Sequence, residues 1–120
     1  MSTDQDGKMA EGEKANGDSK TDEQEQASVV DESEMSPEEK SLHYKQLGND
    51  ALMAGHYNDA VGHYTDAVDA MGNAPVFCNR ALAYIKLENY GLAIADAEAA
   101  IEIDATFAKS YYRKGTAYFA

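Results

Sequence analysis

The sequence predicts an all-α fold made of tandem helix–turn–helix units that follow a disordered acidic tail. Three observations predict it. Small and aromatic residues recur every 33 or 34 positions after residue 40, the first 39 residues contain no aromatic side chain, and a helix-start signal lies between these two regions. A chain of 120 residues allows one small domain plus a tail, which excludes a large enzyme.

The N-terminal segment carries most of the negative charge. The formal net charge of the chain is −12, and residues 1–39 hold 13 Asp and Glu side chains against three lysines. Such a segment buries too little apolar area to offset the entropy lost on ordering its backbone, so residues 1–36 are predicted to be disordered. Two interpretations remain open: a solubilising leader, or an interaction or phosphorylation tail.

Order is predicted to begin at the stretch EMSPEEK, which gives a folded domain over residues 37–120. Ser36 can cap a helix, and Pro37 suits the first helical position, where a backbone N–H would have no partner. Glu39 can complete a capping box with Ser36. The same serine is also a candidate phosphorylation site, since a helix N-terminus favours a phosphate.

The folded domain divides into units 41–73, 74–107 and the first helix of a third unit, 108–120. The first two units match at a spacing of 33: Tyr44 with Phe77, Gly48 with Ala81, Tyr57 with Tyr90, Ala60 with Ala93, and Ala67 with Ala100. The third unit follows 34 positions later, with Tyr111, Gly115 and Tyr118 after Phe77, Ala81 and Tyr84. Gly48 and Ala81 are expected to let a neighbouring helix approach closely. Tyr57 and Tyr90 are expected to wedge between the helices of their units.

This pattern resembles the tetratricopeptide repeat, a helix–turn–helix unit of roughly 34 residues. The resemblance covers residues 41–120 and implies a right-handed superhelical array whose first helices line a concave surface. The chain departs from the pattern in details, since Gly72 and Ala105 stand where proline is common and Ala97 replaces an aromatic residue. Because residues 108–120 supply only one helix of the third unit, that helix is expected to be frayed or marginal.

Each first helix carries polar donors at helical spacing. The pairs are Lys45 with Asn49, Asn79 with Lys86, and Lys109 with Arg113. If these helices line one groove, it holds four cations and two amides although the protein is acidic. Such donors suit a ligand with several carboxylates. Asn79 supports this most strongly, because an amide in a helix interior is disfavoured unless it serves a contact.

The donor set resembles the dicarboxylate clamp of co-chaperone tetratricopeptide domains. The resemblance places five residues on the clamp positions and Lys86 on a further basic position that contacts the peptide; the five are Lys45, Asn49, Asn79, Lys109 and Arg113. It implies binding of the C-terminal Glu-Glu-Val-Asp tail of the 90-kDa heat-shock chaperone, or of its 70-kDa counterpart. Three or four charge-assisted bonds of about 1.5–3 kcal/mol each would supply most of the ~8 kcal/mol of micromolar binding. The alternative is a scaffold groove for another acidic segment.

Two stretches, NRALAYIKLENYGLAIADAEAAIEID and AKSYYRKGTAYFA, most resemble the N-terminal repeats of the protein phosphatase 5 family. That resemblance implies repeats that dock on and regulate a metal-dependent serine/threonine phosphatase domain, with two catalytic metal ions, located after residue 120. No cofactor and no catalysis are then expected within these 120 residues. The alternative is a non-enzymatic adaptor of the Hop or small glutamine-rich type, which has the same clamp residues.

The sequence gives little support for a metal site or a reactive cysteine. The separations of His43, His56 and His63 do not give the i, i+4 pair typical of helical metal sites. Cys78 has no partner cysteine and no obvious base beside it, which predicts a buried, inert thiol. No metal site is therefore expected.

The remaining features concern partners and location. Tyr111 and Tyr112 are interpreted as core and groove-lining rings rather than as a platform for stacking bases. The acidic composition argues against nucleic acid as a partner, and no apolar run approaches the ~20 residues of a membrane span. One cysteine and no apolar stretch after Met1 favour a cytoplasmic location, with the nucleus as a second compartment.

Overall fold

The computed structural model describes residues 31–120. Within that range the chain forms one 3₁₀ helix and five α-helices, without any strand, which confirms the all-α prediction. The elements are η1 (Glu32–Glu34), α2 (Pro37–Met53), α3 (Tyr57–Met71), α4 (Ala74–Lys86), α5 (Tyr90–Ile103) and α6 (Ala108–Tyr118). The first 30 residues of the predicted acidic tail lie outside the described range.

The described residues fall into two separate units, residues 31–34 and residues 35–120. In the first unit, η1 is one short turn in which the Asp31 carboxylate accepts hydrogen bonds from the Ser33 backbone N–H and hydroxyl, at 3.0 and 2.7 Å. These bonds lower the pKa of Asp31. The second unit contains all five α-helices and every predicted site residue.

The first helices of the two complete units are capped by side chains. At α2, Ser36 Oγ accepts from the Glu39 N–H at 3.1 Å and Glu39 Oε1 accepts from the Ser36 N–H at 2.8 Å, which confirms the predicted capping box. At α4, Asn73 Oδ1 accepts from the Val76 N–H at 3.1 Å. The other three α-helices begin without a side-chain cap and depend on packing for their first turn.

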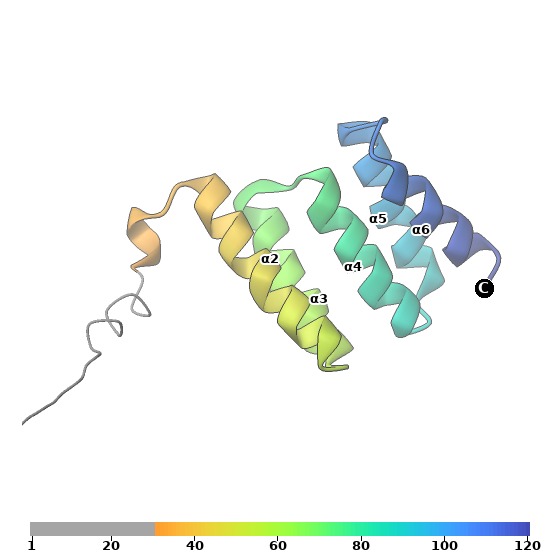
Figure 1. Cartoon of the computed structure of the whole chain (residues 1–120), viewed down its shortest axis with the longest axis horizontal. Helices are drawn as coiled ribbons and strands as arrows, with labels where there is room; N and C mark the ends of the chain where they lie inside the picture. The colour runs from red at the N-terminus through yellow and green to blue at the C-terminus, as the bar shows by residue number, and fades with distance from the viewer. Residues whose placement is uncertain (1–30) are drawn as a thin grey trace, which may run out of the picture. The chain divides into compact units, whose positions relative to one another are not determined.

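The five α-helices form two layers, with α2, α4 and α6 side by side in front of α3 and α5 (Figure 1). The central helix is α4, which contacts each of the other four α-helices. Gly55 and Glu88, 33 positions apart, adopt left-handed backbone conformations with φ of 82° and 61° after α2 and α4. In both turns the N–H of the following residue bonds back to the helix at 2.8 Å, from His56 to Ala51 and from Asn89 to Tyr84.

The core confirms the close helix approach predicted at the small residues. Gly48 on α2 is buried beneath the Tyr64 ring of α3, and a Cβ added at Gly48 would lie 2.5 Å from that ring. In the next unit Ala81 is fully buried. Tyr90 packs on a cluster that contains Ala81 and residues of α5 and α6, so its predicted wedge position is also confirmed.

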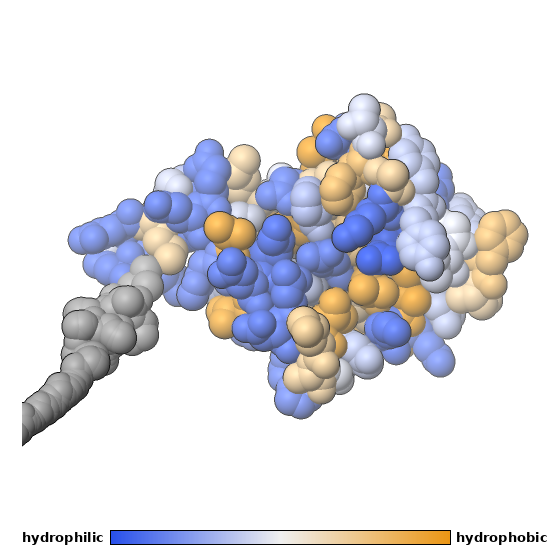
Figure 2. Space-filling view, viewed as in Figure 1, coloured by the Kyte–Doolittle hydropathy of each residue, from blue (hydrophilic) through white to orange (hydrophobic). Residues whose placement is uncertain are grey.

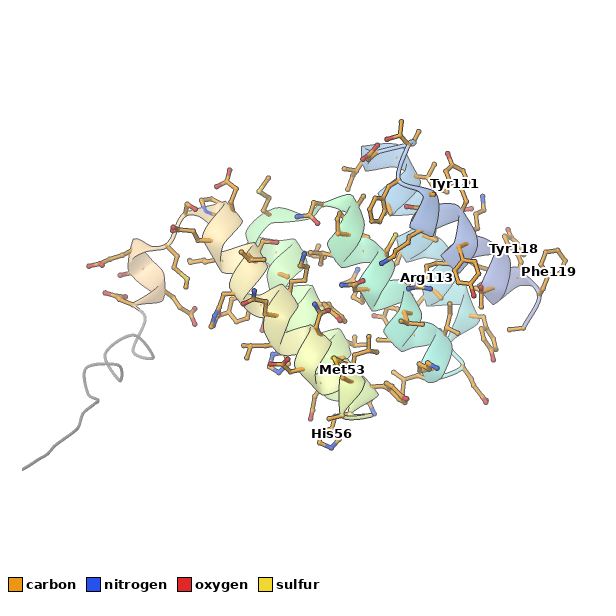
Figure 3. All side chains as sticks on the ribbon, viewed as in Figure 1. Met53, His56, Tyr111, Arg113, Tyr118 and Phe119 are labelled. Atoms are coloured by element: carbon orange, nitrogen blue, oxygen red, sulfur yellow. The ribbon has the colours of Figure 1, made fainter. Side chains whose placement is uncertain are left out.

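The core part of the prediction for Tyr111 and Tyr112 is wrong, whereas their position in a groove stays a prediction. Their side chains are 50% and 67% exposed, because within the described residues no helix covers the outer face of α6. Hydrophobic residues also gather at the C-terminal end of this helix (Figure 2), where Tyr118 and Phe119 project from it (Figure 3). The helix itself forms over 11 residues, and its predicted marginal stability stays a prediction.

Residues 31–120 contain neither a candidate membrane-spanning helix nor a candidate metal-binding cluster. None of the helices between residues 31 and 120 is long and apolar enough to cross a membrane. In the same range, no group of three or more His, Cys, Asp or Glu side chains is arranged to hold a metal ion.

Candidate functional site

Two of the predicted site residues are in direct contact across the front layer. Asn79 on α4 donates from Nδ2 to Asn49 Oδ1 on α2 at 3.0 Å, and the Tyr64 hydroxyl donates to the same oxygen at 2.5 Å. Both lone pairs of the Asn49 carbonyl are thereby used. What the two amides still offer to a ligand is N–H donors: both hydrogens of Asn49 Nδ2 and one of Asn79 Nδ2.

Tyr64 holds this arrangement from beneath. Its side chain is fully buried on α3, and burial raises the pKa of Tyr64 to about 12. The hydroxyl therefore stays protonated at neutral pH and remains a hydrogen-bond donor. Tyr64 is the aromatic residue whose place is taken by Ala97 in the second unit, and nothing in that spacing indicated the bond to Asn49.

Lys109 and Arg113 lie close to the face of α4 that carries Cys78, the neighbour of Asn79. Burial is the main influence on Cys78 and raises the pKa of its thiol, while a hydrogen bond to Ser110 and the charges of Arg113 and Lys109 act in the opposite direction. The Cys78 Sγ and Ser110 Oγ atoms are 3.2 Å apart and join α4 to α6. Cys78 is fully buried, as predicted.

Arg113 has an unusual position for a cation. Its side chain lies between α4 and α6 (Figure 3), with the guanidinium carbon 5.5 Å from the centre of the Tyr112 ring. Its Nε is buried and has no hydrogen-bond partner, which is true of no other buried side-chain nitrogen or oxygen in residues 31–120. An unpaired buried donor costs about 1–3 kcal/mol, so this site is short of an acceptor.

The other predicted cations also lack carboxylate partners. Lys45 on α2 is half-buried and lines a small hollow with Asn73 and Val76, whereas Lys86 in the last turn of α4 and Lys109 on α6 are exposed. Across the described range, no ion pair or hydrogen bond holds any of these three lysines. The convergence of all six predicted residues on one point stays a prediction.

Two further cations of the array are, by contrast, paired. Lys114 Nζ lies 3.3 Å from Glu98 Oε2 in an exposed pair between α6 and α5. Arg80 makes two 2.8 Å hydrogen bonds to the Asp96 carboxylate and one of 3.0 Å from Nη1 to Thr65 Oγ1. This network joins α4 to both α3 and α5.

Arg80 was missed by the sequence analysis, although it joins the helix that carries Asn79 to its neighbours. The hydrogen bond to Asp96 raises the pKa of Arg80 despite its burial, so the guanidinium stays charged. The Phe77 and Tyr84 rings lie 5.5 and 5.9 Å from it on the same helix. Arg80 is thus bonded to both α3 and α5, on the same helix whose Asn79 bonds to Asn49.

Comparisons with known proteins agree with this architecture. The family model described as "Tetratricopeptide repeat" matches residues 74–107. The chain is 43% identical over 82 residues to "Serine/threonine-protein phosphatase T" of Trypanosoma brucei brucei, covering 68% of this chain and 17% of that protein. It is 38% identical over 77 residues to "Serine/threonine-protein phosphatase 5" of Mus musculus, covering 63% of this chain and 15% of that protein. The chain thus spans about a sixth of the length of these relatives.

A solved structure is similar to this chain in both fold and sequence. The second tetratricopeptide domain of Spaghetti (RPAP3), bound to the HSP90 peptide SRMEEVD, superimposes with a TM-score of 0.67 at 35% identity. The match covers 68% of this chain and 77% of that one. The resemblances to tetratricopeptide co-chaperone domains and to protein phosphatase 5 repeats are thereby confirmed as similarities. The chain belongs to the tetratricopeptide repeat family.

Proposed function

We propose that residues 37–120 bind a peptide that ends in a free aspartate, such as the Glu-Glu-Val-Asp tail of a 90-kDa or 70-kDa heat-shock chaperone. The observation that carries the proposal is the Asn49–Asn79 pair, whose amides keep N–H donors for a ligand and lie on the helices that also carry Lys45 and Lys86. The peptide held by the related Spaghetti domain, SRMEEVD, ends in this way.

A C-terminal aspartate suits this donor set because it carries two carboxylates on one residue. The donors proposed for them are Lys45, Asn49, Asn79, Lys109 and Arg113. An internal Asp or Glu offers one carboxylate and an uncharged backbone, so it meets only part of the set. Lys86, seven residues after Asn79 on α4, would contact an acidic side chain further along the peptide.

Arg113 gives the proposal an energetic reason. Its side chain is only half-buried, and within residues 31–120 no carboxylate pairs with its guanidinium, so a ligand carboxylate would supply the missing acceptor. Hydrogen bonds to charged groups contribute about 1.5–3 kcal/mol each, more than neutral ones. Micromolar affinity, about 8 kcal/mol, then needs only a few such bonds plus apolar contacts.

A peptide titration tests the proposal. The peptide SRMEEVD with a free C-terminus should bind with micromolar affinity in calorimetry, and its C-terminally amidated twin at least about tenfold more weakly, because amidation removes one charged acceptor. Lys109→Ala should weaken binding of the free acid strongly. Lys114→Ala is the matched control on the same helix, since Lys114 is paired with Glu98, and it should leave affinity unchanged. Equal binding of the two peptides would remove the proposal.

For the whole protein we propose that these repeats regulate a metal-dependent serine/threonine phosphatase domain that follows residue 120, in the cytoplasm or nucleus. The relatives at 43% and 38% identity, both protein phosphatases, support this. The second candidate is a non-enzymatic adaptor, supported by 37% identity over 83 residues to mouse RNA polymerase II-associated protein 3. Reading the gene beyond residue 120 separates them, because phosphatase metal-ligand motifs would follow only in the first case.

A further inference from the structure

We infer that Tyr64 is a positioning residue for the peptide site and that it acts through Asn49. This inference rests on the proposed function. Tyr64 belongs to α3, in the back layer, and its side chain is fully buried, so it is unable to touch a ligand in the groove. Its hydroxyl nevertheless donates to the side chain of Asn49, which is proposed to touch the ligand.

The hydrogen bonds define which end of the Asn49 amide is presented. Its Oδ1 accepts from both Tyr64 and Asn79, so turning the amide over would place an NH₂ group against two donors. The Nδ2 group makes no hydrogen bond to any residue in the described range and is not among the buried atoms without a partner, so it keeps access to solvent. A carboxylate needs a donor at that place, and Tyr64 keeps the donor there.

The two complete units provide an internal comparison. The residues 33 positions after Asn49 and Tyr64 are Leu82 and Ala97. The first unit has an amide at Asn49 and a hydroxyl beneath it at Tyr64, whereas the second unit, whose amide lies elsewhere on its first helix, has neither group at the matching positions. A ring at this place is therefore not a requirement of the repeat packing, since the second unit packs with Ala97 there.

Gly48 belongs to the same set. The Tyr64 ring occupies the space where a Gly48 Cβ would lie, at 2.5–2.9 Å, so the ring reaches Asn49 only because residue 48 has no side chain. In the second unit the equivalent pair is Ala81 with Ala97, both fully buried. There a small side chain on each helix takes the place of the Tyr64 ring over Gly48. Gly48 and Tyr64 therefore act together to orient the side-chain amide of Asn49.

The substitution Tyr64→Phe tests the inference, because it removes the hydroxyl and keeps the ring over Gly48. We expect affinity for the free-acid peptide SRMEEVD to fall about tenfold, and affinity for the amidated peptide to change less. In the free protein, the side-chain NH₂ resonances of Asn49 should shift or broaden in ¹⁵N–¹H spectra. Tyr90→Phe, the same change at a half-buried tyrosine of α5, should alter neither readout.

A double-mutant cycle separates positioning from a general structural effect. In an Asn49→Ala background, Tyr64→Phe should cause no further loss of affinity, whereas a structural role would cause the same loss in both backgrounds. All titrations are run well below the thermal unfolding midpoint of each variant. Unchanged affinity for Tyr64→Phe in the wild-type background, or an equal loss in both, would overturn the inference while leaving the peptide site itself intact. If the wild-type chain failed to distinguish the two peptides, the proposed function would fail, and this role with it.

Discussion

Helices α4 and α6 are both first helices of a repeat unit, yet they differ in how they are held. The start of α4 is capped by Asn73, five of its 13 residues are buried, and it is packed against four other helices. In contrast, α6 begins at Ala108 after Phe107, whose side chain makes no capping hydrogen bond, and it buries only Ser110 and Ala117. The difference teaches that position in the array, and not the repeat pattern, decides how firmly a helix is fixed.

Each of these helices carries one arginine, and the two side chains show the same contrast. Arg80 of α4 is paired with Asp96, so its charge is satisfied within the protein. Arg113 of α6 keeps a buried Nε without a partner. We therefore expect changes around Arg80 to reduce stability first, and changes at Arg113 to reduce binding first.

The largest effect is expected for Asp96→Ala. Asp96 is 5% exposed, and its removal leaves the Arg80 guanidinium buried and without its carboxylate, which typically costs about 3–5 kcal/mol. For a small domain this is much of the total stability, so urea or thermal unfolding followed by circular dichroism should show a large shift or an unfolded chain. Glu98→Ala removes a carboxylate from the same helix, but from an exposed pair, and should change stability by less than about 0.5 kcal/mol. Similar losses for the two variants would contradict the role given to Arg80.

The next effect concerns binding and is expected for Arg113→Ala. Loss of a charge-assisted bond to the peptide, about 2–3 kcal/mol, should reduce affinity for the free-acid peptide some 30- to 150-fold in calorimetry. The free energy of unfolding should change by less than about 1 kcal/mol, because the substitution removes an unpaired buried donor as well as the contact with Tyr112. A large loss of stability with unchanged affinity would reverse the comparison between the two helices.

Part of this packing could be predicted from the sequence alone, and part could not. The 33-residue spacing predicted the close approach at Gly48 and the wedge at Tyr90, because packing between helices is repeated from unit to unit. It gave no sign of the Arg80–Asp96 pair, since the residues 33 positions earlier are Leu47 and His63 and no charge pair recurs.

For the site, the periodicity found the amides but not their orientation. Asn49 and Asn79 were recognised as donors from their helix positions, whereas their bond to each other and the Tyr64 hydroxyl beneath them depend on how α2, α3 and α4 meet in space. The same periodicity was misleading for Tyr111: the equivalent Phe77 packs on the core, whereas Tyr111 is 50% exposed because no helix of residues 31–120 covers that face of α6.

The smallest effect is expected at the end of α4, where Glu88→Gly should sharpen the contrast by making this helix firmer still. Glu88 has φ of 61°, a left-handed conformation that costs a residue with a side chain roughly 1–2 kcal/mol and costs glycine almost nothing. The greater chain entropy of glycine in the unfolded state offsets about half of this gain, so the net stabilisation should be about 0.5–1 kcal/mol. Glu88→Ala removes the charge but keeps the strain, and the difference between the two variants in urea unfolding isolates the backbone contribution. At the equivalent turn, Gly55→Ala should lose about 1 kcal/mol, since a Cβ there meets no atom within 4 Å and only its φ of 82° opposes the change. Equal stability of the Gly and Ala variants at position 88 would show that the turn relaxes and that no strain is stored there.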